Sequence, residues 1–168
     1  MNVDSFYAIV TGICFALTGL WWNVVEGRKD WLADPKMRSL AGGVYASFLV
    51  PGVMSLGAQI GGENKLVWRT VFVLAALAGI FFTGRLHIHM LKSGQAGLFA
   101  RSRWVVVLLY VLVAILGLLP ELAAPLGLTP IQVEAFLLCI IILNGHGLAW
   151  EMMTRRPAEK PSPENRSS

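Results

Sequence analysis

Five stretches of almost uninterrupted apolar residues make up most of this chain. They cover residues 6–25, 40–60, 67–91, 104–119 and 130–150. Each is close to the roughly 20 residues that a helix needs to cross the hydrocarbon core of a bilayer. Inside a bilayer the backbone must satisfy its own hydrogen bonds, so the five stretches are predicted to be helices and not strands.

The composition indicates the same class of protein. Of the 168 residues, 55% are hydrophobic and 14% are charged, which is outside the range of soluble domains. Residues 157–168 are instead rich in Pro, Ser, Lys and Glu, a composition typical of disorder. The sequence therefore predicts an all-α integral membrane protein with a bundle of five transmembrane helices in residues 1–156, followed by a disordered cytoplasmic tail.

The basic residues predict how the helices are oriented. Loops rich in Lys and Arg stay in the cytoplasm. Twelve of the 14 basic residues lie after the first stretch, around the loop between the third and fourth, and near the C-terminus: Arg28, Lys29, Lys36, Arg38, Arg85, Lys92, Arg101, Arg103, Arg155, Arg156, Lys160 and Arg166. We therefore expect the N-terminus outside and the C-terminus in the cytoplasm of a cell membrane, a bacterial inner membrane in particular. The net charge of +4 then serves topology and contact with the lipid bilayer, and no nucleic-acid partner is expected.

The first predicted helix carries small residues on one face. At 100° per residue they form one stripe, which is typical of a helix-packing face: Ala8, Gly12, Ala16 and Gly19. Asn23 and Glu26 continue the stripe and are expected to point toward other helices. The alternative for Glu26 is that it is simply the first polar residue of the following loop.

The second predicted helix is rich in glycine and contains a proline. Pro51, followed by Gly52, removes a backbone hydrogen bond and should kink the helix near its middle. Such helices occur as moving elements of transporters. Glycines such as Gly57 and Gly61 are equally typical of helices that merely pack closely, and this interpretation is preferred.

Polar side chains gather at the cytoplasmic ends of three predicted helices. They form a candidate site if they converge in the bundle: Asn23, Glu26, His87, Asn144 and His146. Arg85 and His89 fall on another face and are expected to reach the lipid headgroups. If the whole cluster lies at headgroup level, water solvates it and no site is needed.

Two histidines on facing helices at matched depth are what a haem b cofactor requires. His87 and His146 are therefore candidate axial ligands, with Arg85 available to a propionate. No divalent metal site is expected at His87 and His89, because residues two apart on a helix project about 200° from each other.

Three functions fit these features. An accessory, assembly or scaffold subunit of a larger membrane complex ranks first, because it requires no special chemistry. A proton- or ion-coupled transporter or channel, acting as a homo-oligomer, is the alternative, and a haem b electron-transfer subunit is the second alternative. No catalytic motif such as GxSxG, HExxH or a P-loop is present in the sequence, so enzymatic activity is not expected.

Overall fold

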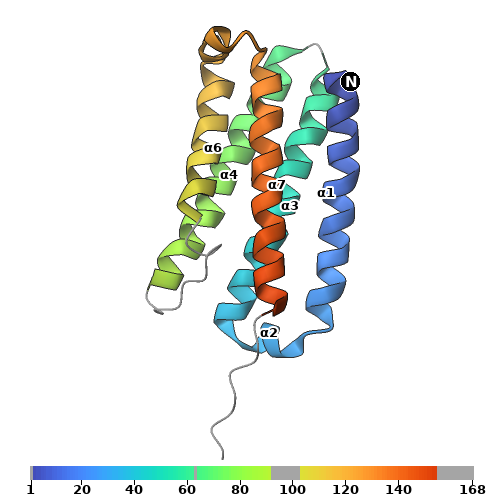
Figure 1. Cartoon of the computed structure of the whole chain (residues 1–168), viewed down its shortest axis with the longest axis vertical. Helices are drawn as coiled ribbons and strands as arrows, with labels where there is room; N and C mark the ends of the chain where they lie inside the picture. The colour runs from blue at the N-terminus through green and yellow to red at the C-terminus, as the bar shows by residue number, and fades with distance from the viewer. Residues whose placement is uncertain (1, 63, 92–102, 155–168) are drawn as a thin grey trace, which may run out of the picture.

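The structure of the chain, a computed structural model, describes residues 2–62, 64–91 and 103–154, without the side chains of residues 85–91 and 103. These residues form helices and no strand (Figure 1). The helices are α1 (Val3–Glu26), α2 (Lys29–Ala33), α3 (Pro35–Gly61), α4 (Lys65–Leu91), α6 (Arg103–Leu118), the 3₁₀-helix η1 (Pro120–Leu126) and α7 (Pro130–Thr154). The tail predicted for residues 157–168 lies outside the described residues, as do Lys92 and Arg101 of the basic loop.

Among the described residues, four helices are long and apolar enough to cross a membrane: α1, α3, α4 and α7. A fifth candidate is α6, which has 16 residues and continues into η1 across a bend of 102°. The all-helical fold class with four or five such helices is therefore confirmed, and it is compatible with a multi-pass membrane protein.

Local signals in the sequence explain where the helices begin. The side chain of Asp34 accepts a 2.8 Å hydrogen bond from the Lys36 amide, and Pro35 occupies the first position of α3. These two residues start α3 five residues before the predicted stretch at residue 40. At α7, the amide of Thr129 donates a 2.8 Å hydrogen bond to Gln132 Oε1, which is the glutamine half of a capping box.

The helix α3 is at the centre of the bundle. It packs against α1, α4 and α7, while α6 packs against α4 and α7. Figure 1 shows α1 at one edge of the bundle and the α4–α6 pair at the other, with α2 at the end opposite η1. A movement of α3 would therefore act directly on α1, α4 and α7, and on α6 only through α4 and α7.

The glycines of α3 lie where α4 approaches most closely. A Cβ atom at Gly57 would overlap the side chain of Val71, and one at Gly61 would lie 2.9 Å from the backbone nitrogen of Trp68. These contacts support the close-packing interpretation of both glycines.

The helix α1 packs through a face different from the one expected. Its small residues and their continuation, Asn23 and Glu26, are exposed, and no described atom of another helix lies within 4 Å of a Cβ built at Gly12 or Gly19. The buried face instead consists of Tyr7, Val10, Cys14, Thr18, Trp21 and Val25. The expectation that the small stripe meets other helices of the bundle is wrong, because the large side chains on the opposite face fill the contact with α3.

Candidate functional site

A pocket of about 620 Å³ lies between α3, α4, α6 and α7. On α3 its lining runs from Pro35, at the end that carries α2, to Val50. The lining thus follows α3 for about 22 Å at 1.5 Å per residue. Pockets of this volume are typical of small-molecule binding sites.

All four helices contribute polar groups to the pocket. Arg38 and Ser47 belong to α3, Thr83 to α4, Tyr110 to α6 and Asn144 to α7. The Ser47 hydroxyl donates a 2.8 Å hydrogen bond to the Gly43 carbonyl, so its proton is used within α3. Arg38 is the only charged side chain among the described residues that line the pocket, and the other lining groups are mainly apolar.

Tyr110 closes the inner end of the pocket. A Cβ atom at Gly79 would lie 2.7 Å from the Tyr110 ring, so only glycine allows the ring to lie against the backbone of α4. Tyr110 is almost fully buried and is the one polar side chain within residues 105–118. Its hydroxyl group is therefore held where α4 and α6 meet.

A layer of apolar side chains lies beyond Tyr110. Its members are all 1% exposed or less: Phe72 and Ala76 on α4, Val113 on α6, and Leu138 and Ile141 on α7. The pocket therefore ends inside the bundle and does not continue to the end that carries η1.

Glu134 lies on the far side of this layer. It belongs to the buried face of α7, which continues through Leu138, Ile141 and Gly145, and its side chain is 0% exposed. Neither carboxyl oxygen has a hydrogen-bond partner among the described residues. A buried polar group without a partner is rare in native proteins and requires an explanation.

Glu134 and Arg69 meet at the C-terminal end of α6. A Cβ atom at Gly117 would lie 3.9 Å from Glu134 Oε1, which places the carboxyl group beside the α6 backbone. Arg69 Nε donates a 2.7 Å hydrogen bond to the Gly117 carbonyl, and its Nη2 donates a 2.9 Å hydrogen bond to the Leu118 carbonyl. The guanidinium group thus caps α6 and does not bind the carboxyl group.

The hydroxyl group of Tyr7 is also committed elsewhere. Tyr7 is 1% exposed and lies near Glu134, but its hydroxyl donates a 2.8 Å hydrogen bond to the Ile131 carbonyl. This bond fixes α1 to the first turn of α7. The Tyr7 hydroxyl therefore stabilises the packing of α1 on α7, and it donates no hydrogen bond to the Glu134 carboxyl group.

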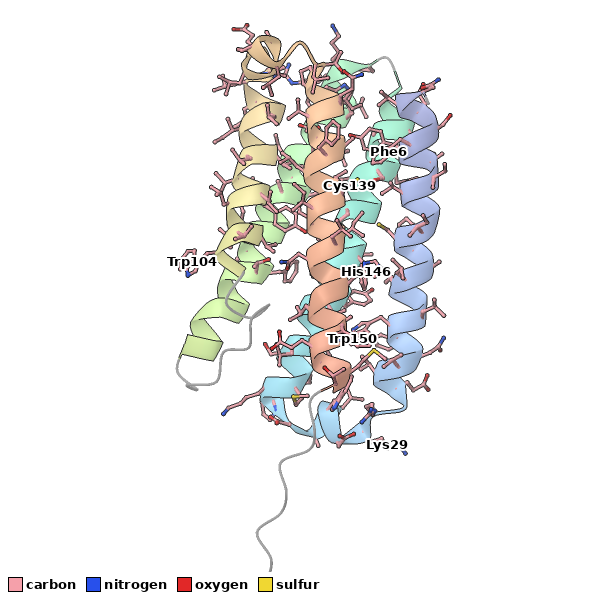
Figure 2. All side chains as sticks on the ribbon, viewed as in Figure 1. Phe6, Lys29, Trp104, Cys139, His146 and Trp150 are labelled. Carbon is pink, nitrogen blue, oxygen red and sulfur yellow. The ribbon has the colours of Figure 1, made fainter. Side chains whose placement is uncertain are left out.

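The five residues of the predicted polar cluster have different surroundings. Asn144 lines the pocket, whereas Asn23 and Glu26 are exposed on the outward face of α1. His146 is exposed; its ring packs edge-on against Phe48 at 5.1 Å, and its Nδ1 lies 2.9 Å from the Ile142 carbonyl. Figure 2 shows Cys139, His146 and Trp150 following one another along α7 toward the end with α2.

The side chains of His87, Arg85 and His89 lie outside the described residues. Haem ligation by His87 and His146, and headgroup contact by Arg85 and His89, therefore stay predictions. His146 itself is not among the residues that line the pocket. The described residues contain no group of three or more His, Cys, Asp and Glu side chains that could hold a metal ion.

Pro51 and Gly52 lie next to the inner part of the pocket. Pro51 is buried inside α3, directly after the lining residue Val50. A Cβ atom at Gly52 would lie 3.1 Å from the Cβ of Cys14, so this pair also faces α1. The missing backbone hydrogen bond at Pro51 is thus located beside the pocket.

Sequence reasoning missed Glu134, Tyr110 and Gly79 as members of a site. A signal for Glu134 is present: an ionisable residue inside an apolar stretch, spaced four and seven residues from Leu138 and Ile141 on one helical face. The Tyr110–Gly79 contact joins two helices and has no counterpart in the sequence pattern.

Comparisons with protein-family models, curated protein sequences and solved structures give no significant match for this chain. The chemistry of the site therefore follows from its own residues. They combine a pocket at the end of the bundle with α2, a buried apolar layer and a buried carboxyl group beyond that layer.

Proposed function

We propose that this chain is a proton-coupled membrane carrier that binds a small amphipathic solute in the pocket between α3, α4, α6 and α7. The observation that carries this proposal is the extent of the pocket, whose lining runs along α3 from Pro35, at the end with α2, and stops at Val50, Tyr110 and the apolar layer, short of the end with η1. A carrier that alternates between two openings is expected to have such one-sided states. An accessory or scaffold subunit requires no interior space.

The lining residues favour a neutral or anionic solute. Most of them are apolar, hydroxyl or amide groups, and the charged one among those described is Arg38, in the first turns of α3 near the end with α2. An anionic group of a solute would be attracted to the guanidinium of Arg38. Its apolar part would lie deeper, against Val50 and Val106.

The distribution of basic residues supports the orientation of the carrier. Arg28, Lys29, Lys36 and Arg38 lie at the end of the bundle with α2, which we assign to the cytoplasm. The pocket then opens toward the cytoplasm of a cell membrane, most simply a bacterial inner membrane, and the N-terminus lies outside. The moving element is α3, because Pro51 weakens its backbone beside the pocket.

A second candidate is an accessory or assembly subunit of a membrane complex. The uncovered small-residue face of α1, with exposed Gly12 and Gly19, favours it because such faces allow close helix contact. The same face would serve a homo-oligomer of the carrier. Purification in mild detergent discriminates: a scaffold subunit brings a larger partner with it, whereas the carrier purifies alone or as copies of itself.

The carrier proposal is tested by filling the pocket. Gly42 lines the pocket, and a Cβ atom there meets no other helix within 4 Å, so Gly42→Phe adds a large side chain at the pocket wall that starts in open space. The matched control is Gly12→Phe, which makes the same change on the outward face of α1. Purified protein is first screened by thermal shift against neutral and anionic amphiphiles, and the stabilising compound is then used for uptake into proteoliposomes.

We expect Gly42→Phe to abolish both the thermal shift and the uptake, and Gly12→Phe to keep the thermal shift. Solute binding that is unchanged in Gly42→Phe would contradict the assignment of the pocket. Oligomeric state measured on Gly12→Phe reports separately on the α1 face.

A further inference from the structure

A carboxylate at the position of Glu134 requires compensation. The side chain is 0% exposed, and neither oxygen has a hydrogen-bond partner among the described residues. Moving an ionised carboxyl group out of water is costly unless it is neutralised or paired. Three solutions exist: a bound proton, a bound metal cation, or a shift of a neighbouring cation onto the carboxylate.

The neighbouring groups limit these solutions. Arg69 of α4 is the cation close to Glu134, and Tyr7 of α1 donates its hydroxyl proton to Ile131. Cys139 lies on α7 itself, α6 presents Gly117, and Glu121 of η1 is exposed. The titratable and charged side chains of α3 belong to its opposite end, from Lys36 to Tyr45.

A metal cation is the poorer solution. A Na⁺ ion or another hard cation requires several oxygen ligands. Here the carbonyl oxygens of Gly117 and Leu118 already accept hydrogen bonds from Arg69, whose positive charge would repel the ion. A proton needs only one carboxyl oxygen.

We infer that Glu134 is the proton-binding site of this protein, and that Arg69 replaces the proton by moving from the α6 carbonyls to the carboxylate when the proton leaves. This inference deepens the proposed function. It rests on that function only in assuming that proton binding is coupled to solute transport. In the step, the O–H bond of the Glu134 carboxyl breaks, the proton passes to water at the η1 end, and hydrogen bonds from the guanidinium to Gly117 and Leu118 are exchanged for bonds to the carboxylate.

The exchange links the proton to the pocket through α6. Arg69 holds the last carbonyls of α6, next to the 102° bend into η1, while Val106 and Tyr110 of the same helix line the pocket. Releasing these carbonyls loosens the end of the helix that closes the pocket. The protonation state of Glu134 on α7 thereby sets how firmly Arg69 holds the end of α6, the helix that carries Val106 and Tyr110 of the pocket lining.

The test is labelling by the hydrophobic carbodiimide dicyclohexylcarbodiimide on the full chain in native membranes. A protonated carboxyl group adds across one C=N bond of the reagent, its proton goes to nitrogen, and the O-acylisourea rearranges to a stable N-acylurea. The adduct therefore gains the whole mass of the reagent. Peptide mass spectrometry is expected to find it on Glu134 at mildly acidic pH, with labelling lost at alkaline pH, and not on exposed Glu26 or Glu121 when a water-soluble nucleophile is present.

Arg69→Gln gives the readout that separates exchange from simple burial. Without the guanidinium, the carboxylate has no replacement for its proton, so the pH at which labelling is half lost is expected to rise relative to wild type. An unchanged pH profile in Arg69→Gln would overturn the exchange, and absence of the adduct on wild-type Glu134 at every pH would overturn the proton site. Both measurements use the wild-type carboxyl group, so neither depends on the folding of a Glu134 variant.

Uptake measurements separate this inference from the proposed function. If Glu134→Gln still shows uptake that depends on a pH gradient, the carrier function stands and the proton site is wrong. If Glu134 is labelled as expected and no compound is transported, the proton site stands and the carrier function is wrong.

Discussion

Arg69 and Glu134 approach the same residue, Gly117, from different helices, and the guanidinium binds the glycine carbonyl while the carboxyl group stays unpartnered. The hydrogen bond from Arg69 Nε to Gly117 is 2.7 Å long, and a Cβ atom at Gly117 would lie 3.9 Å from Glu134 Oε1. The Arg69 guanidinium is bonded to the end of α6 in this state, and it lies close enough to pair with the Glu134 carboxylate in a second state of the protein. This arrangement couples the protonation of Glu134 to the end of α6.

Glu134→Leu is expected to keep or raise the free energy of unfolding. The carboxyl group has no partner to lose, and leaving a buried polar group unsatisfied costs about 1–3 kcal/mol, a cost that leucine avoids. The measurement is unfolding in detergent, followed by circular dichroism. Leu138→Ala, one turn away on the same buried face, is the control and should cost about 2–5 kcal/mol. A comparable loss in Glu134→Leu would show that the carboxyl group has a structural role.

Arg69→Gln is expected to lower the free energy of unfolding by about 1–3 kcal/mol. The side chain is partly buried and makes two charge-assisted hydrogen bonds to the end of α6. Limited proteolysis near residues 119–129 should become faster, because the last turn of α6 loses its cap. Lys65→Gln, at the exposed start of the same helix, should change neither measurement. Equal effects of the two substitutions would contradict the capping role.

Gly79→Ala is expected to destabilise the protein by about 1–3 kcal/mol, because the added Cβ atom would lie 2.7 Å from the Tyr110 ring. Gly42→Ala is the matched control in the same pocket, since a Cβ atom there meets nothing within 4 Å. The control should be neutral or gain up to about 1 kcal/mol from helix propensity. Identical thermal stability of the two variants would contradict the ring-on-backbone contact.

Two adjacent tryptophans are expected to respond differently to the same change. Trp21 is 5% exposed and its indole nitrogen donates a 2.9 Å hydrogen bond to the Ala41 carbonyl, whereas Trp22 is 62% exposed. Trp21→Phe should therefore cost about 1–3 kcal/mol and Trp22→Phe less than about 0.5 kcal/mol. Unfolding in detergent checks both, and a larger effect at Trp22 would contradict the orientation of α1.

The helix class and most helix positions follow from the sequence, because long apolar runs and capping residues are local signals. Thr129 and Gln132, for example, are typical capping residues and are bonded to each other at the start of α7. The face on which a helix packs does not follow from the sequence in the same way. In a chain where both the lipid-facing and the core-facing residues are apolar, hydrophobic periodicity does not tell them apart. The stripe of Gly12 and Gly19 therefore resembles a packing face in the sequence, whereas it is exposed in the structure.

The candidate site was only partly accessible to prediction for a related reason. Of the predicted polar cluster, Asn144 lines the pocket, whereas Asn23, Glu26 and His146 do not. The pocket itself depends on contacts between helices, such as Tyr110 against Gly79, which no single helix pattern contains. Glu134 carried the clearest signal, an acidic residue on a core-facing heptad spacing, but recognising it required knowing that this face is fully buried.

One measurement tests the carrier account most directly: the sidedness of access to the pocket. In a Cys14→Ala, Cys139→Ala background, single cysteines are placed at Ser39 and Ser47 of the pocket lining and at Ala76 of the apolar layer. A membrane-impermeant maleimide is then applied to right-side-out and inside-out vesicles. The account predicts that Ser39→Cys and Ser47→Cys react in inside-out vesicles alone, and that Ala76→Cys reacts in neither. Reaction of Ser47→Cys from both sides would indicate an open channel. Reaction from neither side would show that the pocket is closed. Either result would contradict a carrier open toward the cytoplasm.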